Sequence, residues 1–218
     1  MDKRSNSDAA PAREDEALLA AWVDGDRQAS ETLVRRHYRS IYLFLFNEVG
    51  SDRAADLTQA TFETLCAKKV TFRGDATVRT YLFGIARWKL VEDLRQARGK
   101  AFDPMEESFE IASVTQSITS LFADGQREKL VVRALRALSL DDQLLLELKD
   151  YEGLTTRELA ATYEVSRDAM SGRVTRARER LAAKVRELSS SAKLVESTLT
   201  GLDECMALIR ERLADRRL

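Results

Sequence analysis

The side chains in this sequence that are best suited to chemistry are arginines and lysines, and they gather in two stretches. Residues 68–100 hold nine basic and three acidic residues, a net charge of +6. Residues 167–186 hold seven basic and two acidic residues, a net charge of +5. Residues 101–125 lie between them and hold five acidic residues and no basic ones, although the whole chain carries only −1. Charge separated in this way suits contact with phosphates at two places.

Aromatic residues are interleaved with the first basic stretch. They are Phe72, Tyr81, Phe83 and Trp88. A base that has left its stack can rest on such a ring and gain about 1–3 kcal/mol. We expect Phe83 to be a core residue, and we expect Tyr81 and Trp88 to form a partly exposed platform. The alternative for either basic stretch taken alone is an ordinary solvated helix face.

The second basic stretch belongs to a predicted helix-turn-helix unit. Thr155 and Glu158 form a capping box that starts a short helix ending at about Thr162. Residues 163–165 form a tight turn, and Ser166 caps a longer helix that runs to about residue 188. Side chains near the start of such a trailing helix can reach base edges in the major groove, whereas later ones face the phosphates.

The composition predicts an all-α protein. Only 2 Pro and 9 Gly among 218 residues are too few turn-formers for a sandwich or barrel of many short strands. Apolar residues at spacings of three and four predict four helices over residues 16–98. We expect two small helical domains, 16–100 and 127–188, joined by a loosely structured acidic linker, 101–126. Residues 1–15 are expected to be disordered.

Residues 189–218 form a further C-terminal helical extension. Its apolar residues recur at alternating spacings of four and three, which is a heptad-like seam: Val195, Leu199, Leu202, Met206, Ile209 and Leu213. Two interpretations stay open. The helix packs on the second domain of its own chain, or it is a latch that covers a binding surface or docks a partner.

Enzyme chemistry finds little support in the residue types. The one histidine, His37, has no convergent carboxylate, Cys or Ser partner in the sequence pattern, and no Gly-rich phosphate loop is present. Cys66 and Cys205 lie far apart and lack metal-ligand spacing. We therefore expect no catalytic site, no cofactor and no metal. No apolar run approaches the roughly 20 residues of a membrane span, so we expect a cytoplasmic protein without membrane insertion.

Two sets of motifs resemble the extracytoplasmic-function (ECF) sigma factors of bacterial RNA polymerase. The first set resembles their domain 2 and comprises residues 56–62 (DLTQATF), 72–76 (FRGDA) and 79–87 (RTYLFGIAR). The second set resembles their domain 4 and comprises residues 151–155 (YEGLT), 158–160 (ELA) and 173–178 (RVTRAR). The resemblance covers about residues 16–98 and 127–186, in the family's order.

The resemblance implies a transcription initiation factor that binds core RNA polymerase, recognises promoters and melts DNA. The implied polymerase contacts are Asp56, Leu57, Gln59, Thr61 and Phe62. The implied −10 contacts are Phe72, Arg73, Gly74, Asp75, Arg79, Tyr81, Arg87, Trp88 and Lys89. The implied −35 contacts are Thr155, Ser166, Arg167, Met170, Ser171, Arg173, Arg176 and Arg178. The acidic linker would thread toward the polymerase active centre and RNA exit path, and an anti-sigma factor is a further possible partner.

One departure from the family pattern concerns the turn of the helix-turn-helix. Glu164 stands where the family usually has glycine. A left-handed backbone at this residue would cost about 1 kcal/mol.

The alternative function is a helix-turn-helix transcriptional regulator that acts without joining polymerase. In that case residues 16–98 would serve as a dimerisation or sensor domain. Stoichiometric association with core polymerase discriminates between the two functions.

Overall fold

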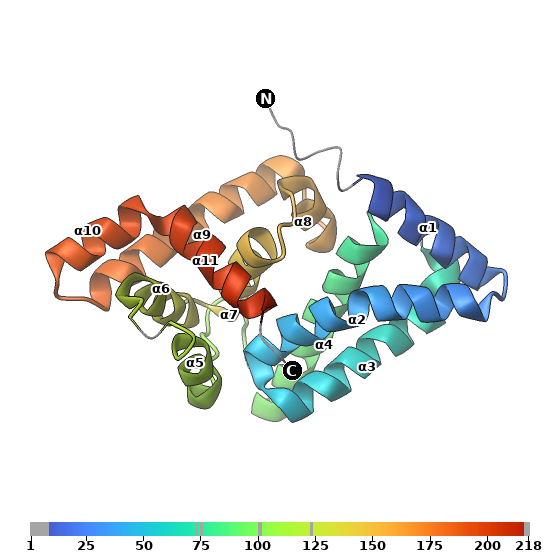
Figure 1. Ribbon diagram of the computed structural model, residues 1–218, viewed down its shortest axis with the longest axis horizontal. Coiled ribbons are helices and arrows are strands. Elements are labelled where there is room, and N and C mark those ends of the chain that lie inside the picture. The colour runs from blue at the N-terminus through green and yellow to red at the C-terminus, as the bar shows by residue number, and fades with distance from the viewer. Residues whose placement is uncertain (1–8, 73, 75, 100–101, 123, 216–218) are drawn as a thin grey trace.

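The computed structural model describes residues 9–72, 74, 76–99, 102–122 and 124–215, with side chains from Arg13 onward. Figure 1 shows two helical lobes side by side, with α1 to α4 in one and α5 to α11 in the other. Throughout the described residues the regular secondary structure is helical, apart from a single bridge between Ser108 and Ser139. The prediction of an all-α protein is therefore confirmed.

The first lobe comprises α1 (Ala9–Val23), α2 (Arg27–Val49), α3 (Ser51–Lys68), the 3₁₀ turn η1 (Lys69–Thr71) and α4 (Val78–Arg98). Asp26 caps α2 by accepting hydrogen bonds from two backbone amides, and Thr77 caps α4 by accepting one from the Thr80 amide. The rings of Phe44 and Phe83 meet edge to face, 5.5 Å apart, in the core. Apolar faces at helical spacing thus bring four helices around one core.

The expectation of disorder over residues 1–15 is wrong for the part that the structure describes. Helix α1 begins at Ala9, and residues 1–8 lie outside the described residues. Asp15 is buried, and its carboxylate lies 2.7 Å from His37 Nε2 and accepts a 2.6 Å hydrogen bond from Arg36. Burial lowers the pKa of His37. These contacts hold α1 against α2, and sequence pattern does not reveal them.

The second lobe is built around the predicted helix-turn-helix. It contains α6 (Gln126–Arg136), α7 (Leu140–Leu146), the π-helical turn η2 (Glu147–Tyr151), α8 (Thr156–Thr162) and α9 (Arg167–Glu187). Two caps fall where the sequence predicts them, the Thr155–Glu158 capping box before α8 and Ser166 before α9, and Ser139 caps α7.

The acidic segment 101–126 is more ordered than we expected. It contains α5 (Ala112–Thr119), which contacts both α2 and α6. Five of its apolar side chains are buried: Phe102, Phe109, Val114, Ile118 and Phe122. Backbone carbonyls of Glu107 and Pro104 accept 2.8 Å hydrogen bonds from the first amides of α7. The acidic side chains of the segment face solvent, whereas its apolar side chains face the core. The segment therefore packs against both lobes.

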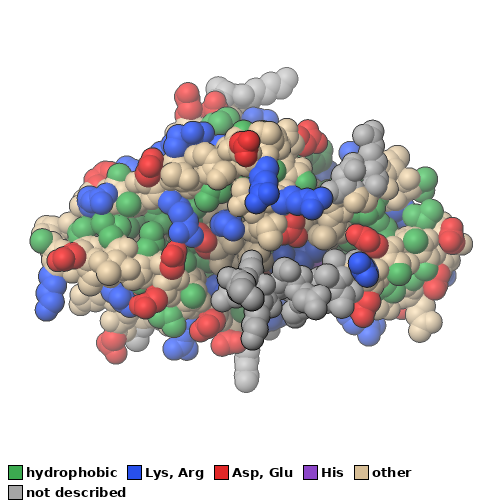
Figure 2. All heavy atoms as spheres, turned by 90° about the horizontal axis from the view of Figure 1, so that it is seen from above, with side chains coloured by type: hydrophobic (Ala, Val, Ile, Leu, Met, Phe, Trp, Pro, Cys, Tyr) green, Lys and Arg blue, Asp and Glu red, His purple; other side chains and the backbone are tan. Residues whose placement is uncertain are grey.

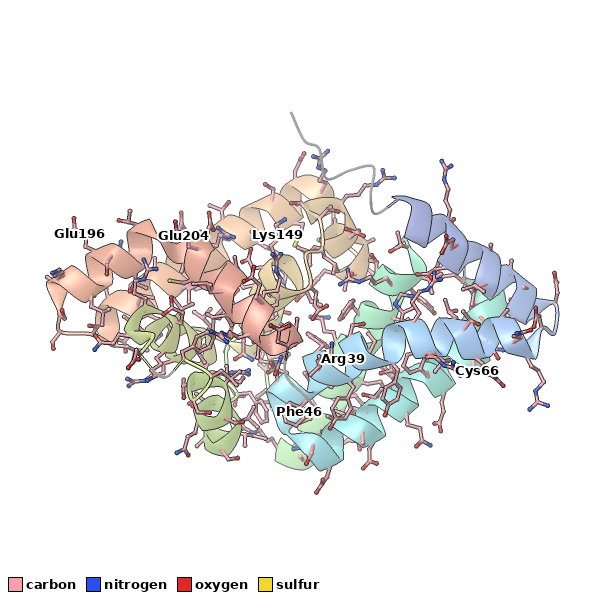
Figure 3. All side chains as sticks on the ribbon, viewed as in Figure 1. Arg39, Phe46, Cys66, Lys149, Glu196 and Glu204 are labelled. Atoms are coloured by element: carbon pink, nitrogen blue, oxygen red, sulfur yellow. The ribbon has the colours of Figure 1, made fainter. Side chains whose placement is uncertain are left out.

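The C-terminal extension forms two helices, α10 (Ala192–Thr200) and α11 (Leu202–Ala214), which meet at Gly201. Buried Met206, Ile209 and Leu213 lie on α11, which contacts α6 and η2. Packing on the second lobe is thus what the structure shows for this seam. At its end the Ala214 carbonyl accepts a 2.7 Å hydrogen bond from Arg39 Nη2 of α2, and Figure 3 shows Arg39 beside the end of α11.

A buried polar network joins the two lobes. Arg136 of α6 donates to the Glu48 carboxylate at 2.9 Å and to the Asn47 carbonyl at 2.6 Å, both on α2. Gln143 donates to the same Glu48 oxygen, and Glu147 lies 3.6 Å from the guanidinium. Burial and the nearby Glu48 carboxyl raise the pKa of Glu147 well above its usual range. The contact between the lobes is therefore held by charge pairing as well as by apolar packing.

Replacing Arg136 by alanine leaves Glu48 buried without its partner. We expect the free energy of unfolding in urea to fall by about 3–5 kcal/mol. The matched control is Arg133→Ala on the exposed side of the same helix, with an expected change within about 0.5 kcal/mol. Equal effects of the two substitutions would show that the network contributes nothing specific.

Candidate nucleic-acid interface

The start of α9 presents polar side chains to solvent, as a recognition helix would. Five of the residues expected to contact the −35 element are exposed: Thr155, Ser166, Arg167, Ser171 and Arg176. Ser166 Oγ also accepts a hydrogen bond from the Ala169 amide, so this side chain fixes the helix start. Met170 is different, because its side chain is fully buried. The structure gives Met170 a packing role in place of the expected DNA contact.

Two of the expected −35 contacts on α9, Arg173 and Arg178, are engaged by carboxylates. Arg173 forms an ion pair with Asp141 of α7, and its guanidinium carbon lies 4.9 Å from the centre of the Tyr163 ring. Arg178 donates to Asp150 at 2.6 Å and to Asp203 at 2.8 Å. Both guanidinium groups are therefore already neutralised in the isolated chain.

The aromatic residues of the first basic stretch divide as the sequence predicts. Phe83 is fully buried, whereas Trp88 is 52% exposed and has Lys89 Nζ 4.6 Å from its ring centre. Tyr81 is half-buried, and its ring lies 5.3 Å from that of Phe72. Gly74 is exposed in the loop before α4 with φ +74°, while Arg73 and Asp75 lie outside the described residues.

Arg79 and Arg87 of α4 point at the opposite lobe. Arg79 Nη2 donates to the Glu152 carbonyl at 2.7 Å and to its carboxylate at 3.1 Å. Arg87 Nη2 donates to Asp141 at 2.6 Å, and its guanidinium carbon lies 4.0 Å from the Tyr163 ring centre. Asp141 therefore binds one arginine from each basic stretch. Sequence reasoning missed these acidic partners, since no spacing pattern links α4 to α7 or η2.

The mixed charge is visible on the surface. Figure 2 views the molecule from above, and Lys and Arg side chains there lie among Asp and Glu side chains. They do not form one continuous basic patch on this face. Carboxylates thus pair with part of the positive charge of the two stretches, at Arg79, Arg87, Arg173, Arg178 and Arg180.

The expected polymerase-binding residues of α3 are only partly exposed. Asp56 and Gln59 face solvent, and Gln59 donates a 2.8 Å hydrogen bond to Glu63. Leu57, Thr61 and Phe62 are buried. These three side chains hold α3 in the lobe, so direct contact with a partner falls to the exposed positions.

An aromatic row on α2 was not predicted as a site. Tyr38, Tyr42 and Phe46 stack in succession, with ring centres 6.2 and 5.8 Å apart, and Tyr38 also stacks on Phe62 of α3. Tyr38 is 44% exposed. The spacing of four residues in the sequence is the signal that could have revealed the row.

Features of other site classes were also sought. Across the described residues no group of three or more His, Cys, Asp or Glu side chains is placed to hold a metal ion. Nor does any helix in the described part of the chain have the length and apolar character needed to cross a membrane.

Comparison with known proteins agrees with this fold of two helical lobes and a helix-turn-helix. No protein-family model matches the chain. The chain is 30% identical over 171 residues to the ECF RNA polymerase sigma factor SigM of Mycobacterium tuberculosis, covering 78% of this chain and 84% of that protein. It is 27% identical over 182 residues to the ECF RNA polymerase sigma-E factor of Escherichia coli, covering 80% and 95%.

Solved structures show the same fold. CnrH in complex with the cytosolic domain of CnrY matches with a TM-score of 0.58 and 24% identity, covering 81% of this chain and 99% of that one. The sigma factor RpoE in complex with the anti-sigma factor NepR from Bartonella quintana matches with a TM-score of 0.51 and 20% identity, covering 72% and 96%. The identity to SigM, together with this fold, places the protein in the class of sigma factors. The chain belongs to the ECF RNA polymerase sigma factor family.

The turn of the helix-turn-helix carries backbone strain. Glu164 has φ +53°, the left-handed conformation anticipated for the position where the family usually has glycine. We expect Glu164→Gly to raise the free energy of unfolding by about 0.5–1 kcal/mol, since glycine adopts this conformation without a Cβ clash. Glu164→Ala keeps the Cβ and is the control. A glycine variant no more stable than the alanine variant would contradict the strain.

Proposed function

We propose that this protein binds core RNA polymerase, directs it to promoters and assists DNA melting. The observation that carries the proposal is one chain in which two stretches rich in arginine and lysine, residues 68–100 and 167–186, fall on separate lobes. One surface belongs to a helix-turn-helix, and the other combines an exposed tryptophan with basic side chains. Paired surfaces of these two kinds suit duplex DNA and melted single strand respectively.

Recognition of the −35 element is assigned to the first turns of α9. Arg167, Ser171 and Arg176 are exposed there and can reach base edges. Thr155 and Ser166 cap the two helices and lie close to where phosphates would pass. Arg173 and Arg178 can join only when their carboxylate partners release them.

Recognition of the −10 element is assigned to the loop before α4 and to the exposed side of α4. An unstacked base can lie on Trp88, with Lys89 beside it for the adjoining phosphate. Phe72, Tyr81, Arg79 and Arg87 extend this surface toward the second lobe. Arg73, Gly74 and Asp75 remain proposed contacts of the loop.

Contact with core polymerase is assigned to the exposed side of α3, where Asp56 and Gln59 lie. In this proposal residues 16–100 and 127–188 act as the family's domains 2 and 4. Residues 101–126 act as the connection that enters the polymerase channel. Their exposed acidic side chains suit the basic walls of a channel built for nucleic acid.

Because the CnrH and RpoE structures contain CnrY and an anti-sigma factor, we include an anti-sigma protein among the proposed partners.

Run-off transcription tests the function. Purified chain is mixed with core polymerase and a promoter library, and association with core is measured in parallel by gel filtration. We expect stoichiometric association and new start sites that core alone does not use. DNA binding without core association would favour the alternative, a regulator that acts outside polymerase.

One prediction of the proposed function concerns the reading of bases by α9. Arg176→Ala should weaken promoter binding of the holoenzyme by about 1–3 kcal/mol if the guanidinium reads a base bidentately. Arg186→Ala, on an exposed position near the end of α9, is the control with a matching charge change. Filter binding on a selected promoter measures both. Identical affinities of the two variants would remove Arg176 from the reading surface.

Another prediction of the proposed function concerns Trp88 as the surface on which an unpaired base stacks. Trp88→Ala should reduce open-complex formation more than initial promoter binding, because stacking is available only to an unpaired base. Trp88→Phe keeps an aromatic face and should restore most of the melting. Permanganate footprinting reports unpaired thymines, and a Trp88→Ala footprint equal to that of the wild type would refute the platform.

A further inference from the structure

A cavity of about 380 Å³ lies where α3 and α4 of the first lobe meet the turn of the helix-turn-helix. This volume falls within the range of about 300–1,000 Å³ that is typical of small-molecule sites. The first lobe contributes Lys68, Tyr81, Arg87 and Trp88 to the wall, and the second lobe contributes residues 161–164. Flat aromatic rings and charged side chains thus line the same cavity, a combination that suits a flat, charged ligand.

Two charged side chains of the cavity wall are not engaged by the protein itself. Lys68 stands at the end of α3, and Glu164 stands in the turn of the helix-turn-helix. Both are exposed, and within the described residues neither side chain has an ion-pair or hydrogen-bond partner. A ligand between them would therefore meet a cation from one lobe and an anion from the other.

Trp88 supplies an aromatic surface to the same wall, and its side chain is 52% exposed. The ring of Tyr163 is less available, because the guanidinium carbons of Arg87 and Arg173 lie 4.0 and 4.9 Å from its centre. Arg87 Nε and Tyr163 Oη are buried without a hydrogen-bond partner in the described part of the chain. Because buried polar atoms normally have a partner, the residues of this wall keep unused hydrogen-bonding capacity.

The backbone strain at Glu164 indicates that its carboxylate has a use. The residue has φ +53°, a conformation that glycine adopts without a Cβ clash. Strained residues cluster at ligand clamps and other functional sites. A glycine would relieve the strain and would also remove the carboxylate from the cavity wall. The retained carboxylate is therefore a candidate for recognition of a ligand.

We propose that this cavity binds a guanine nucleotide. The Watson–Crick edge of guanine carries two adjacent N–H donors, on N1 and N2, which the two oxygens of one carboxylate accept together. Adenine presents one donor beside an acceptor, and a carboxylate repels that acceptor. In the proposed site Glu164 binds the guanine edge, Trp88 stacks on the base and Lys68 pairs with the phosphate. The inference goes beyond the proposed function and does not depend on it, since the isolated chain is the binding species.

Equilibrium dialysis of the full chain against guanosine monophosphate (GMP), adenosine monophosphate (AMP) and guanosine tests the proposal. We expect AMP to bind at least about tenfold more weakly than GMP, because its base lacks the paired donors that match Glu164. Guanosine lacks the phosphate and should also bind about tenfold more weakly. Trp22→Phe leaves Trp88 as the single tryptophan, and GMP should quench its fluorescence over the same concentrations at which dialysis detects binding.

Two variants assign the two ends of the ligand. Glu164→Gln keeps the shape of the side chain and should remove the preference for GMP over AMP, because an amide offers one donor and one acceptor. Lys68→Ala should weaken GMP binding by about tenfold. Lys193→Ala, at an exposed position of α10 in the other lobe, has the same change of charge and should leave GMP binding unchanged.

Each contrary outcome overturns the proposal. Equal binding of GMP and AMP by the full chain would show that only the phosphate is held, and a preference for GMP that survives Glu164→Gln would place the guanine edge elsewhere. Equal effects of Lys68→Ala and Lys193→Ala, or unquenched Trp88 at saturating GMP, would place the nucleotide outside this cavity. None of these outcomes bears on the proposed function, which is tested by association with core polymerase and by run-off transcription.

Discussion

The arrangement of this molecule depends on carboxylates that must be paired because they are buried. Asp141 meets arginines from both lobes, and Glu48 meets Arg136 across the same contact. An isolated buried carboxylate is very costly, whereas a paired one adds little net stability over an apolar contact. These groups therefore specify how the lobes sit together more than they hold them together. Orientation is fixed by charge, while stability comes from the apolar core within each lobe.

This division between orientation fixed by charge and stability from the apolar cores has consequences for function. Removing one partner of a buried pair leaves an uncompensated charge, so a phosphate can take an arginine from Asp141 only where water or another cation reaches that carboxylate. DNA supplies phosphates in excess and releases counterions on binding, so its advantage over a carboxylate is greatest at low salt. In a chain with a net charge of −1, both basic stretches have acidic partners within the chain.

Local signals made much of the fold predictable, and long-range contacts made the rest unpredictable. Thr155 with Glu158, and Ser166, cap α8 and α9 as predicted, because capping depends on neighbours three residues away. The start of α1 was missed because Asp15 is fixed by His37, twenty-two residues later. The order in segment 101–126 was missed because its charge was weighed above its buried phenylalanines.

For the site, the exposure of Trp88 and Arg176 was predictable from helix position. The burial of Met170 and the pairing of Arg87 with Asp141 depend on the tertiary structure.

The distance between the lobes is the most direct measure of the account. Spin labels at Gln96→Cys on α4 and Glu179→Cys on α9, both exposed and introduced with Cys66→Ser, report it by pulsed electron paramagnetic resonance. One short, narrow distance distribution is predicted for the isolated chain, and a longer one once core polymerase and promoter DNA are bound. An unchanged distribution in a complex that transcribes would contradict the account, because Arg79 and Arg87 would then work without leaving Glu152 and Asp141.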